Sequence, residues 1–542
     1  MDKIVNVPSD IYSYVEILNK QLYFAVVKSK YTTKLKSTMD TFFFSIDDDF
    51  IYENYYCDFG PLNISCLYKY CCKLKKYLQY AKGLKRVVHY TSNYPEKKTN
   101  AACLMGLFCI IYLKFHPKDV WKMLQEVGPY KPFLDASQFP CGFTLKIVDC
   151  LHALTKAITF NFFNFDDFNV AEYDLHDKLQ YGDMNWLVPR KFLAFIGPAD
   201  NRTAHPPEFY LKYFLKNDIK TVIRLNTIIY DAAVFTQVGI QHYDLIFPDG
   251  TTPPKDILLR FLSISEMASA AIAVHCKAGL GRTGSLIGAY LIKHYHMSAK
   301  EAIAWMRICR PGSVIGQQQI WLEKLESWLW RLGNQYRASK YGDSDKIPKH
   351  KYGIYSKLWP REREKIINEA RKKIQKSFTK SQLEKLSKQK KLVTNFEILS
   401  WKDKNEKLLK KYGSDISSHN SVSKLLSSIH GLDNTENIKV LSVNPIRKNS
   451  LYSTSSVSTK SKELNSNTLR SGAGKANSDE HFKNKSTSGL PNWKNIVEYS
   501  KLYVKENVAN RHSTQGDKLN EIKSIRYSNK IARDSFSNSK HS

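Results

Sequence analysis

Residues 272–284 read Ile-Ala-Val-His-Cys-Lys-Ala-Gly-Leu-Gly-Arg-Thr-Gly, and this stretch decides the fold. The apolar run before Cys276 predicts a strand, and the pattern from Thr283 to Tyr295 predicts a helix. The strand therefore delivers the cysteine to a glycine-rich loop that ends at a helix N-terminus. Such a loop binds anions, because its backbone N–H groups converge in front of the positive end of the helix dipole.

The loop contains the residue types that cysteine-based phosphoryl transfer requires. A helix N-terminus and a nearby cation lower the pKa of a cysteine to about 3.5–7.5, so Cys276 is the candidate nucleophile. Arg282 can offer paired donors to phosphoryl oxygens, and the Thr283 hydroxyl can stabilise the departing sulfur. The alternative is a buried cysteine beside a structural turn, which the strand–loop–helix context disfavours. The candidate phosphate-binding residues are Lys277, Ala278, Gly279, Leu280, Gly281 and Arg282.

Two further catalytic candidates lie outside this loop. Asp249, in a Pro-Asp-Gly turn after a predicted strand, is the candidate general acid, because a serine alkoxide leaves poorly without a proton. An ordinary turn-forming Asp-Gly pair is the alternative. Gln318 is a candidate to hold the water that hydrolyses a phosphocysteine, unless it merely caps a helix. We expect no cofactor, and the sequence has no clustered ligand spacing that indicates a metal site.

Strand and helix patterns alternate over residues 186–345, which predicts a mostly parallel sheet flanked by helices. Residues 1–159 have a similar α/β pattern, and loop 91–100 repeats the strand–loop–helix order without any Cys or Arg. We therefore expect two tandem domains of one fold, of which the first lacks catalytic residues. The expected strands of the second domain are 192–196, 221–225, 243–247 and 270–275, and its first helices are 206–217, 231–238 and 255–268.

Residues 160–185 form an acidic linker in a basic chain, which has 82 Lys and Arg against 51 Asp and Glu. Asp174 and Asp177 share a face if this piece is helical, and Asp183 follows shortly after. A solvated surface is the usual meaning of such a run. Beside a phosphate site, however, the three carboxylates could select a basic residue of the substrate.

Residues 346–542 are expected to be a disordered basic tail, because a segment rich in Lys, Ser and Asn buries too little apolar surface to fold. Such a tail can contact nucleic acid, acidic proteins or import receptors, or can simply solubilise the chain, and the sequence leaves these open. We recognise no signal peptide and no membrane-spanning run, which predicts an intracellular protein with reduced thiols.

The motifs HCKAGLGRTG, FPDGTTPP, TVIRLN, GDMNWLVP and RICRPGSVIGQQQ together resemble the cell-division-cycle-fourteen phosphatases, a branch of the dual-specificity protein tyrosine phosphatases. The resemblance implies two tandem phosphatase-like domains, of which only the second is catalytic. It implies hydrolysis of phosphoserine, phosphothreonine and phosphotyrosine, with preference for phosphoserine-proline sites made by cyclin-dependent kinases. By motif, Cys276 is the nucleophile, Arg282 the phosphate ligand and Asp249 the acid, and the three linker aspartates form an acidic groove.

The resemblance also implies a cellular setting. It predicts a role in mitotic exit and cytokinesis, with residence in nucleus and nucleolus, and in cytoplasm, spindle pole and division site during mitosis. The implied partners are phosphoprotein substrates, with transport receptors and a nucleolar anchor on the tail and no membrane. One alternative is a phosphoinositide phosphatase, although such enzymes carry a second Lys where this chain has Leu280. The other is a scaffold anchored by its tail, with secondary catalysis.

Overall fold

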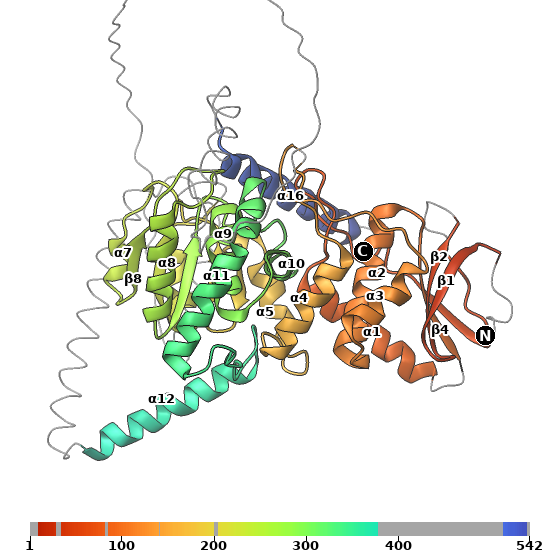
Figure 1. Ribbon diagram of the computed structural model, residues 1–542, viewed down its shortest axis with the longest axis horizontal. Coiled ribbons are helices and arrows are strands. Elements are labelled where there is room, and N and C mark those ends of the chain that lie inside the picture. Colours follow the sequence, from red (N-terminus) through yellow and green to blue (C-terminus); the bar gives the residue numbers. More distant parts are fainter. Residues whose placement is uncertain are drawn as a thin grey trace, which may run out of the picture. The chain divides into compact units, whose positions relative to one another are not determined.

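Two mostly parallel sheets, each with flanking helices, organise the chain, and the α/β architecture expected from the sequence is confirmed (Figure 1). The computed structural model describes residues 9–28, 34–81, 85–139, 141–199, 204–377 and 513–538. Apart from residues 368–377, all of these belong to one unit.

The first sheet has the strand order β1-β2-β4-β3. β1 runs antiparallel to β2, whereas β2 and β3 both lie parallel to the central strand β4. A short loop connects β4 to α2. The elements of this half are β1 (Ile11–Leu18), β2 (Leu22–Val27), β3 (Thr41–Phe44), α1 (Ile64–Ala81), β4 (Arg86–Thr91), α2 (Pro95–Phe108), η1 (Cys109–Leu113), α3 (Pro117–Gln125) and α4 (Ile147–Thr159).

The second sheet has the order β5-β6-β9-β7-β8, and only β5 is antiparallel to its neighbour. The central strand β9 is buried along its length, so its carboxyl end opens into the middle of the sheet edge. Its elements are α5 (Val170–His176), η2 (Leu179–Tyr181), β5 (Met184–Val188), β6 (Phe192–Phe195), α6 (Glu208–Lys216), β7 (Ile219–Arg224), α7 (Ala233–Thr236), β8 (Gln241–Asp244), α8 (Lys255–Met267), β9 (Ala271–His275), α9 (Gly281–Tyr295), α10 (Ala299–Cys309), α11 (Gln317–Tyr341), α12 (Leu358–Ser377) and α16 (Gln515–Asn538).

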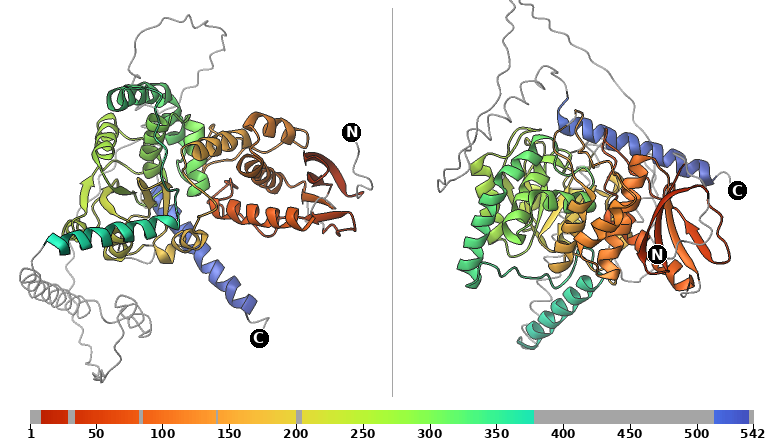
Figure 2. Two further views of the ribbon diagram at one scale, coloured as in Figure 1. Left: turned by 90° about the horizontal axis from the view of Figure 1, so that it is seen from below. Right: turned by 45° about the vertical axis from the view of Figure 1, so that its right-hand side comes forward.

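The two halves share one continuous hydrophobic core. Helix α4 of the first half packs against α10 of the second, as both views of Figure 2 show. The Tyr173 hydroxyl donates to the Cys309 carbonyl at 2.9 Å, which ties the linker helix α5 to the end of α10. The halves therefore pack directly against each other, which allows them to line a pocket jointly.

Two element boundaries differ from the sequence prediction. The strand expected at 243–247 ends at Asp244; Leu245 and Phe247 are buried in the following loop, and buried apolar side chains there imitate a strand pattern. The apolar spacing over residues 141–159 also predicts a helix, but the helix begins only at Ile147. Before it, Leu145 instead pairs its backbone with Phe133, at 2.8 and 3.1 Å.

The predicted start of the disordered tail at residue 346 is also too early. Ile354 and Tyr355 are buried, and the Tyr355 carbonyl accepts from the Asn169 N–H at 2.8 Å. Residues 513–538 are a second ordered segment, and helix α16 makes up most of it. A composition averaged over the whole tail conceals two such short segments. Residues 378–512, the largest part of the expected tail, lie outside the described residues.

Candidate active site

The loop between β9 and α9 approaches neighbouring backbone so closely that two positions require glycine. Gly279 has φ +69°, and a Cβ there would lie 2.1 Å from the Phe195 carbonyl oxygen. From the other side, a Cβ on Gly197 would lie 2.3 Å from the Cys276 carbonyl oxygen. The loop is therefore tightly clamped.

The carbonyl groups of the loop are held from outside. The Lys277 carbonyl accepts from the Gly197 N–H at 3.0 Å, and Arg310 donates to the carbonyls of Ala278 and Gly279 at 3.2 and 2.8 Å. In a trans peptide the C=O and the next N–H point in opposite directions, so the N–H groups of this loop face inward. The loop thus presents an anion cradle of the kind that the sequence predicts.

Cys276 lies at the base of this cradle with only 3% of its surface exposed. Burial raises the pKa of its thiol, but the positive charge of Arg282 and hydrogen bonding from Thr283 outweigh burial, and the net pKa is lowered. The Thr283 hydroxyl is buried and makes no other hydrogen bond among the described residues. The surroundings therefore favour a thiolate.

Arg282 and Asp249 meet beside the cradle. The Arg282 guanidinium donates to the carbonyls of Leu225 and Phe247 at 3.2 and 2.9 Å, and pairs with Asp249 Oδ1 at 3.1 Å. Its Nε is buried without a partner among the described residues. The Nε–H thus remains available for an anion, and the candidate acid lies next to the candidate phosphate ligand.

Gln318 reaches the loop, but its amide is already engaged. Its Oε1 accepts from the Ile315 N–H and its Nε2 donates to the Thr251 carbonyl, both at 3.1 Å. A Cβ on Gly281 would lie 2.8 Å from Gln318 Oε1. Gln318 therefore connects the cradle with the loop that carries Asp249, and its role in holding water remains a prediction.

His275, directly before the nucleophile, is completely buried. Burial lowers its pKa to about 3, so the ring is neutral. Its Nε2 lies 2.7 Å from the Tyr230 hydroxyl and its Nδ1 lies 3.0 Å from the Cys276 carbonyl oxygen. These contacts make it an orienting residue rather than a base.

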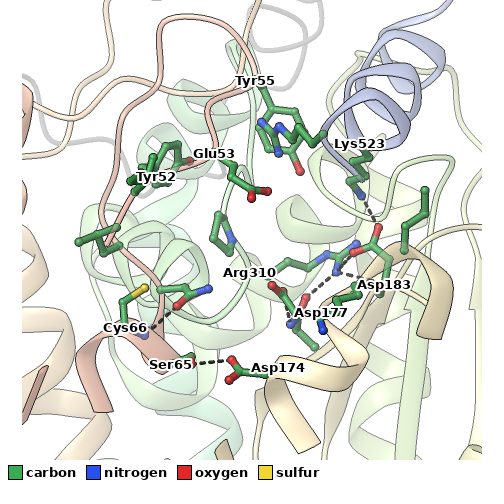
Figure 3. Close-up of a pocket in the computed structure, with 18 of the residues that line it drawn as sticks. Tyr52, Glu53, Tyr55, Ser65, Cys66, Asp174, Asp177, Asp183, Arg310 and Lys523 are labelled. Carbon is green, nitrogen blue, oxygen red and sulfur yellow. Dashed lines mark hydrogen bonds and ion pairs between the residues drawn. The ribbon is translucent and has the colours of Figure 1, made fainter. Parts of the chain in front are cut away.

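A pocket of about 410 Å³ adjoins the cradle and contains all three linker aspartates (Figure 3). Both halves line it. The residues of the first half include Tyr52, Glu53, Tyr55 and Ser65, and those of the second include Leu280 and Arg310. The structure thus brings together carboxylates that the sequence could only place in one linker.

The outer two aspartates differ in their partners. Asp174 accepts from the Ser65 hydroxyl at 2.6 Å and pairs with Lys69 at 2.7 Å, so its charge is partly balanced. Asp177 accepts from the Asn185 amide at 2.9 Å. Burial, with a smaller contribution from the negative charge of Asp183, raises the pKa of Asp177 to about 6.

Asp183 is the buried carboxylate nearest the cradle. Burial raises its pKa, but the charges of Arg310 and Lys523 outweigh burial, so the net pKa is lowered and the group is ionised. Arg310 NH1 lies 2.7 Å from Asp183 Oδ1 and 2.5 Å from Asn185 Oδ1, while its Nε bonds the Gly279 carbonyl. One guanidinium therefore connects the acidic pocket with the cradle.

Sequence reasoning missed both Arg310 and Glu53 as components of this site. Arg310 is recognisable in the sequence only as a helix end before Pro-Gly, and arginine is mostly exposed in proteins, so the sequence does not signal its burial. Glu53 comes from a loop of the first half. No local pattern announces its contribution, because the contact depends on how the two halves pack.

In the first half, a carboxylate of the protein itself binds to the loop that corresponds in position to the cradle. The loop after β4 corresponds in topology to the loop after β9, since each follows the central parallel strand of its sheet and precedes a helix. There Asp47 accepts from the Ser92 N–H and from the Thr91 hydroxyl, each at 2.8 Å. The buried carboxylate occupies donors of this loop, which fits a half without phosphate chemistry.

Within the part of the chain that the structure describes, no three His, Cys, Asp or Glu side chains gather where they could hold a metal ion. Nor does any helix there have the length and apolarity needed to cross a membrane.

Two family descriptions match the chain. Residues 16–157 match "Dual specificity protein phosphatase, N-terminal half", and residues 197–296 match "Polymorphic toxin system, DSP-PTPase phosphatase". The second match includes the whole cradle.

Curated relatives align with much of the ordered part of the chain. Dual specificity protein phosphatase CDC14AB of Danio rerio is 48% identical over 341 residues, which cover 61% of this chain and 55% of that protein. CDC14B of Mus musculus is 46% identical over 340 residues, covering 61% of this chain and 69% of that protein. The chain spans about half the length of several of these curated relatives, CDC14AB among them.

Solved structures resemble the chain more weakly. The active form of Tk-PTP is 26% identical, and the alignment covers 27% of this chain and 96% of that one, with a TM-score of 0.24. A score this low supports no argument about the whole chain.

Proposed function

The chain belongs to the CDC14 family of dual-specificity protein phosphatases, and from this premise we propose that it hydrolyses phosphoserine, phosphothreonine and phosphotyrosine in proteins. The observation that carries the proposal is the constellation around Cys276. Its sulfur has a lowered pKa and lies at the base of a cradle of inward N–H groups, with Arg282 and Asp249 at one side.

The proposed mechanism has two steps. The Cys276 thiolate attacks phosphorus and forms the S–P bond as the substrate's P–O bond breaks, and Asp249 donates its proton to the leaving serine oxygen. The cradle and Arg282 hold the phosphoryl oxygens, which requires Arg282 to exchange Asp249 for substrate. Water then attacks the phosphocysteine, releasing phosphate and the thiolate, while Asp249 takes a proton back. We assign Gln318 to positioning that water and Thr283 to stabilising the sulfur.

We propose that the acidic pocket selects substrates. A peptide whose phosphoserine enters the cradle would extend along the adjoining pocket, where Asp174, Asp177 and Asp183 attract a basic side chain. The charge of the pocket supports a basic residue further along the substrate, and the proposed preference for phosphoserine-proline sites of cyclin-dependent kinases rests on membership of the family. The corresponding role is in mitotic exit and cytokinesis.

The proposed organisation follows from these assignments. Residues 1–159 supply one wall of the pocket without catalysis, 160–185 supply its aspartates, and 186–345 supply the catalytic loop. We further propose nuclear and nucleolar residence, with cytoplasmic, spindle-pole and division-site populations in mitosis. Transport receptors and a nucleolar anchor would bind the tail.

Two substitutions test the chemistry. Cys276→Ser should abolish phosphate release from a phosphoserine peptide while keeping the peptide bound, because a hydroxyl at this site is not ionised. Asp249→Ala should slow the same peptide by about 10²–10⁴-fold, but should slow an aryl phosphate far less, because a phenolate needs little protonation. Full turnover by Cys276→Ser would refute the nucleophile, and equal losses on both substrates would remove Asp249 as the acid.

The substrate class needs its own comparison. Phosphate release is measured from a lysine-containing phosphoserine-proline peptide and from phosphoinositide vesicles. We expect the peptide to be preferred, because the buried apolar Leu280 offers no second cation for an inositol phosphate. Preference for the vesicles would contradict the proposal and favour a lipid phosphatase.

A further inference from the structure

The helix α16, near the end of the sequence, is seated at the mouth of the candidate active site. Its chain crosses from the second half toward the first, as Figure 2 shows. It begins next to the cradle: Asp517 pairs with Lys277, and Thr514 and Asp517 cap the helix start through bonds of 3.0 and 3.3 Å. A capped and anchored start fixes the direction of the helix.

One face of α16 meets the catalytic residues. Gly516, Leu519, Asn520 and Lys523 recur at the spacing that places side chains on one side of a helix. The Gly516 N–H donates to Asp249 Oδ2 at 2.8 Å. With Asp249 Oδ1 paired to Arg282, both oxygens of the candidate acid have partners while the helix is bound, and one of these partners belongs to α16.

Lys523 fills the position that a basic substrate residue would take. Its buried ammonium pairs with Asp183 and donates to the Ala278 carbonyl at 2.8 Å, at the junction of pocket and cradle (Figure 3). Since Asp183 also pairs with Arg310, each oxygen of the carboxylate already has a cationic partner while Lys523 is bound there.

Apolar and stacking contacts complete the binding site of α16, which we call the seat. Leu519 is only 2% exposed, in a cluster with Tyr55, Ala136, Ala278, Leu280 and Ile315. One turn beyond Lys523, the Arg526 guanidinium lies 3.8 Å from the centre of the Tyr55 ring. The helix therefore contacts the cradle, the acid and the wall supplied by the first half.

We propose that residues 513–526, which comprise the first part of α16 and the two residues before it, bind the acidic pocket as an internal competitor, so that the bound helix and a substrate exclude each other. The seat opposes catalysis in two ways: it withholds Asp183 from the substrate and Asp249 from the leaving group. Release of the helix is then a point of control over the enzyme. The competition with a substrate rests on the proposed phosphatase function, whereas the binding of α16 to the pocket does not.

A matched pair of substitutions in the full-length chain tests the seat without measuring turnover. Leu519→Asp places a charge in the apolar cluster, whereas Ile525→Asp makes the same kind of change on the same helix at a side chain that is 52% exposed. We expect iodoacetamide to alkylate Cys276 at least tenfold faster in Leu519→Asp than in wild type, as followed by mass spectrometry, and at the wild-type rate in Ile525→Asp. Equal rates in all three would overturn the proposal.

Kinetics then decide whether the seat inhibits. Full-length wild type, Leu519→Asp, Ile525→Asp and Lys523→Gln are assayed with a lysine-containing phosphoserine peptide. We expect Leu519→Asp and Lys523→Gln to lower KM several-fold, without a loss of kcat, and Ile525→Asp to match wild type. A fall in kcat/KM for the two seat variants would mean that α16 assists catalysis, and would overturn the proposal. Absence of turnover from every chain would instead refute the phosphatase function, and the alkylation rates would still decide the seat.

Discussion

Arg310→Met should destabilise the protein and disable the cradle at once. Arg310 is only 2% exposed, and its guanidinium spans from Asp183 and Asn185, at 2.7 and 2.5 Å, to the Gly279 carbonyl at 2.8 Å. Methionine keeps an apolar stem of similar width but removes the charge and every one of these donors.

The size of the effect follows from what is left behind. Removing one partner of a buried ion pair usually costs about 3–5 kcal/mol, because the other charge stays buried. Lys523 still neutralises part of the charge on Asp183, so we expect the lower end, about 3 kcal/mol. That is a large share of a total stability of about 5–15 kcal/mol. The released Ala278 and Gly279 carbonyls should also let the loop move, lowering kcat.

Urea unfolding followed by tryptophan fluorescence measures the change, with Arg260→Met as control because Arg260 is exposed. The double variant Arg310→Met/Asp183→Asn should lose less stability than the sum of the two single variants, since Arg310 and Asp183 are partners in one buried ion pair. The reasoning is refuted if Arg310→Met is as stable as the control, or if the two substitutions simply add.

Three further predictions concern the pocket, the cradle and the first half. The pKa of Asp177 is raised to about 6, so the pocket loses a negative charge as pH falls from 7 to 5. The KM of a lysine-containing peptide, divided by the KM of a peptide without lysine, should therefore rise over this range. In Asp177→Asn the same ratio should not change with pH. Gly279→Ala should lower kcat at least about tenfold in a phosphate-release assay, because its Cβ would clash with the Phe195 carbonyl; an active variant would contradict the clamped loop. Asp47→Ala should cost about 1–3 kcal/mol in urea unfolding, by leaving the Ser92 N–H unpaired, yet leave kcat unchanged.

The cradle could be predicted because its information is local. The strand, the glycines, Cys276 and Arg282 are contiguous in the sequence, so spacing alone indicates their geometry. Asp249 could be predicted for a similar reason, because it is a turn residue that follows a strand of the same sheet. The mostly parallel sheet, with the cradle at the carboxyl end of one of its strands, then follows from the alternation of strands and helices, whereas the strand order does not.

The remaining parts of the site depend on contacts between distant segments. Arg310 and Asp183 are 127 residues apart, and Glu53 reaches the pocket from the other half. The seat of α16 was concealed by composition, although Thr514 and Asp517 form a capping pattern and Leu519 begins an apolar face. A few well-placed side chains order such a segment, whereas averages over a long tail report only its solvent-exposed majority.

The pocket wall from the first half has an evolutionary consequence. Bond-breaking depends on one loop of the second half, whereas Tyr52, Glu53 and Tyr55 belong to a separate stretch that contains none of the reacting groups. Substitutions there can redirect which proteins are chosen while leaving the reaction itself intact. With the proposed division of roles, the first half gives the lineage a surface on which target choice can diversify at little chemical risk.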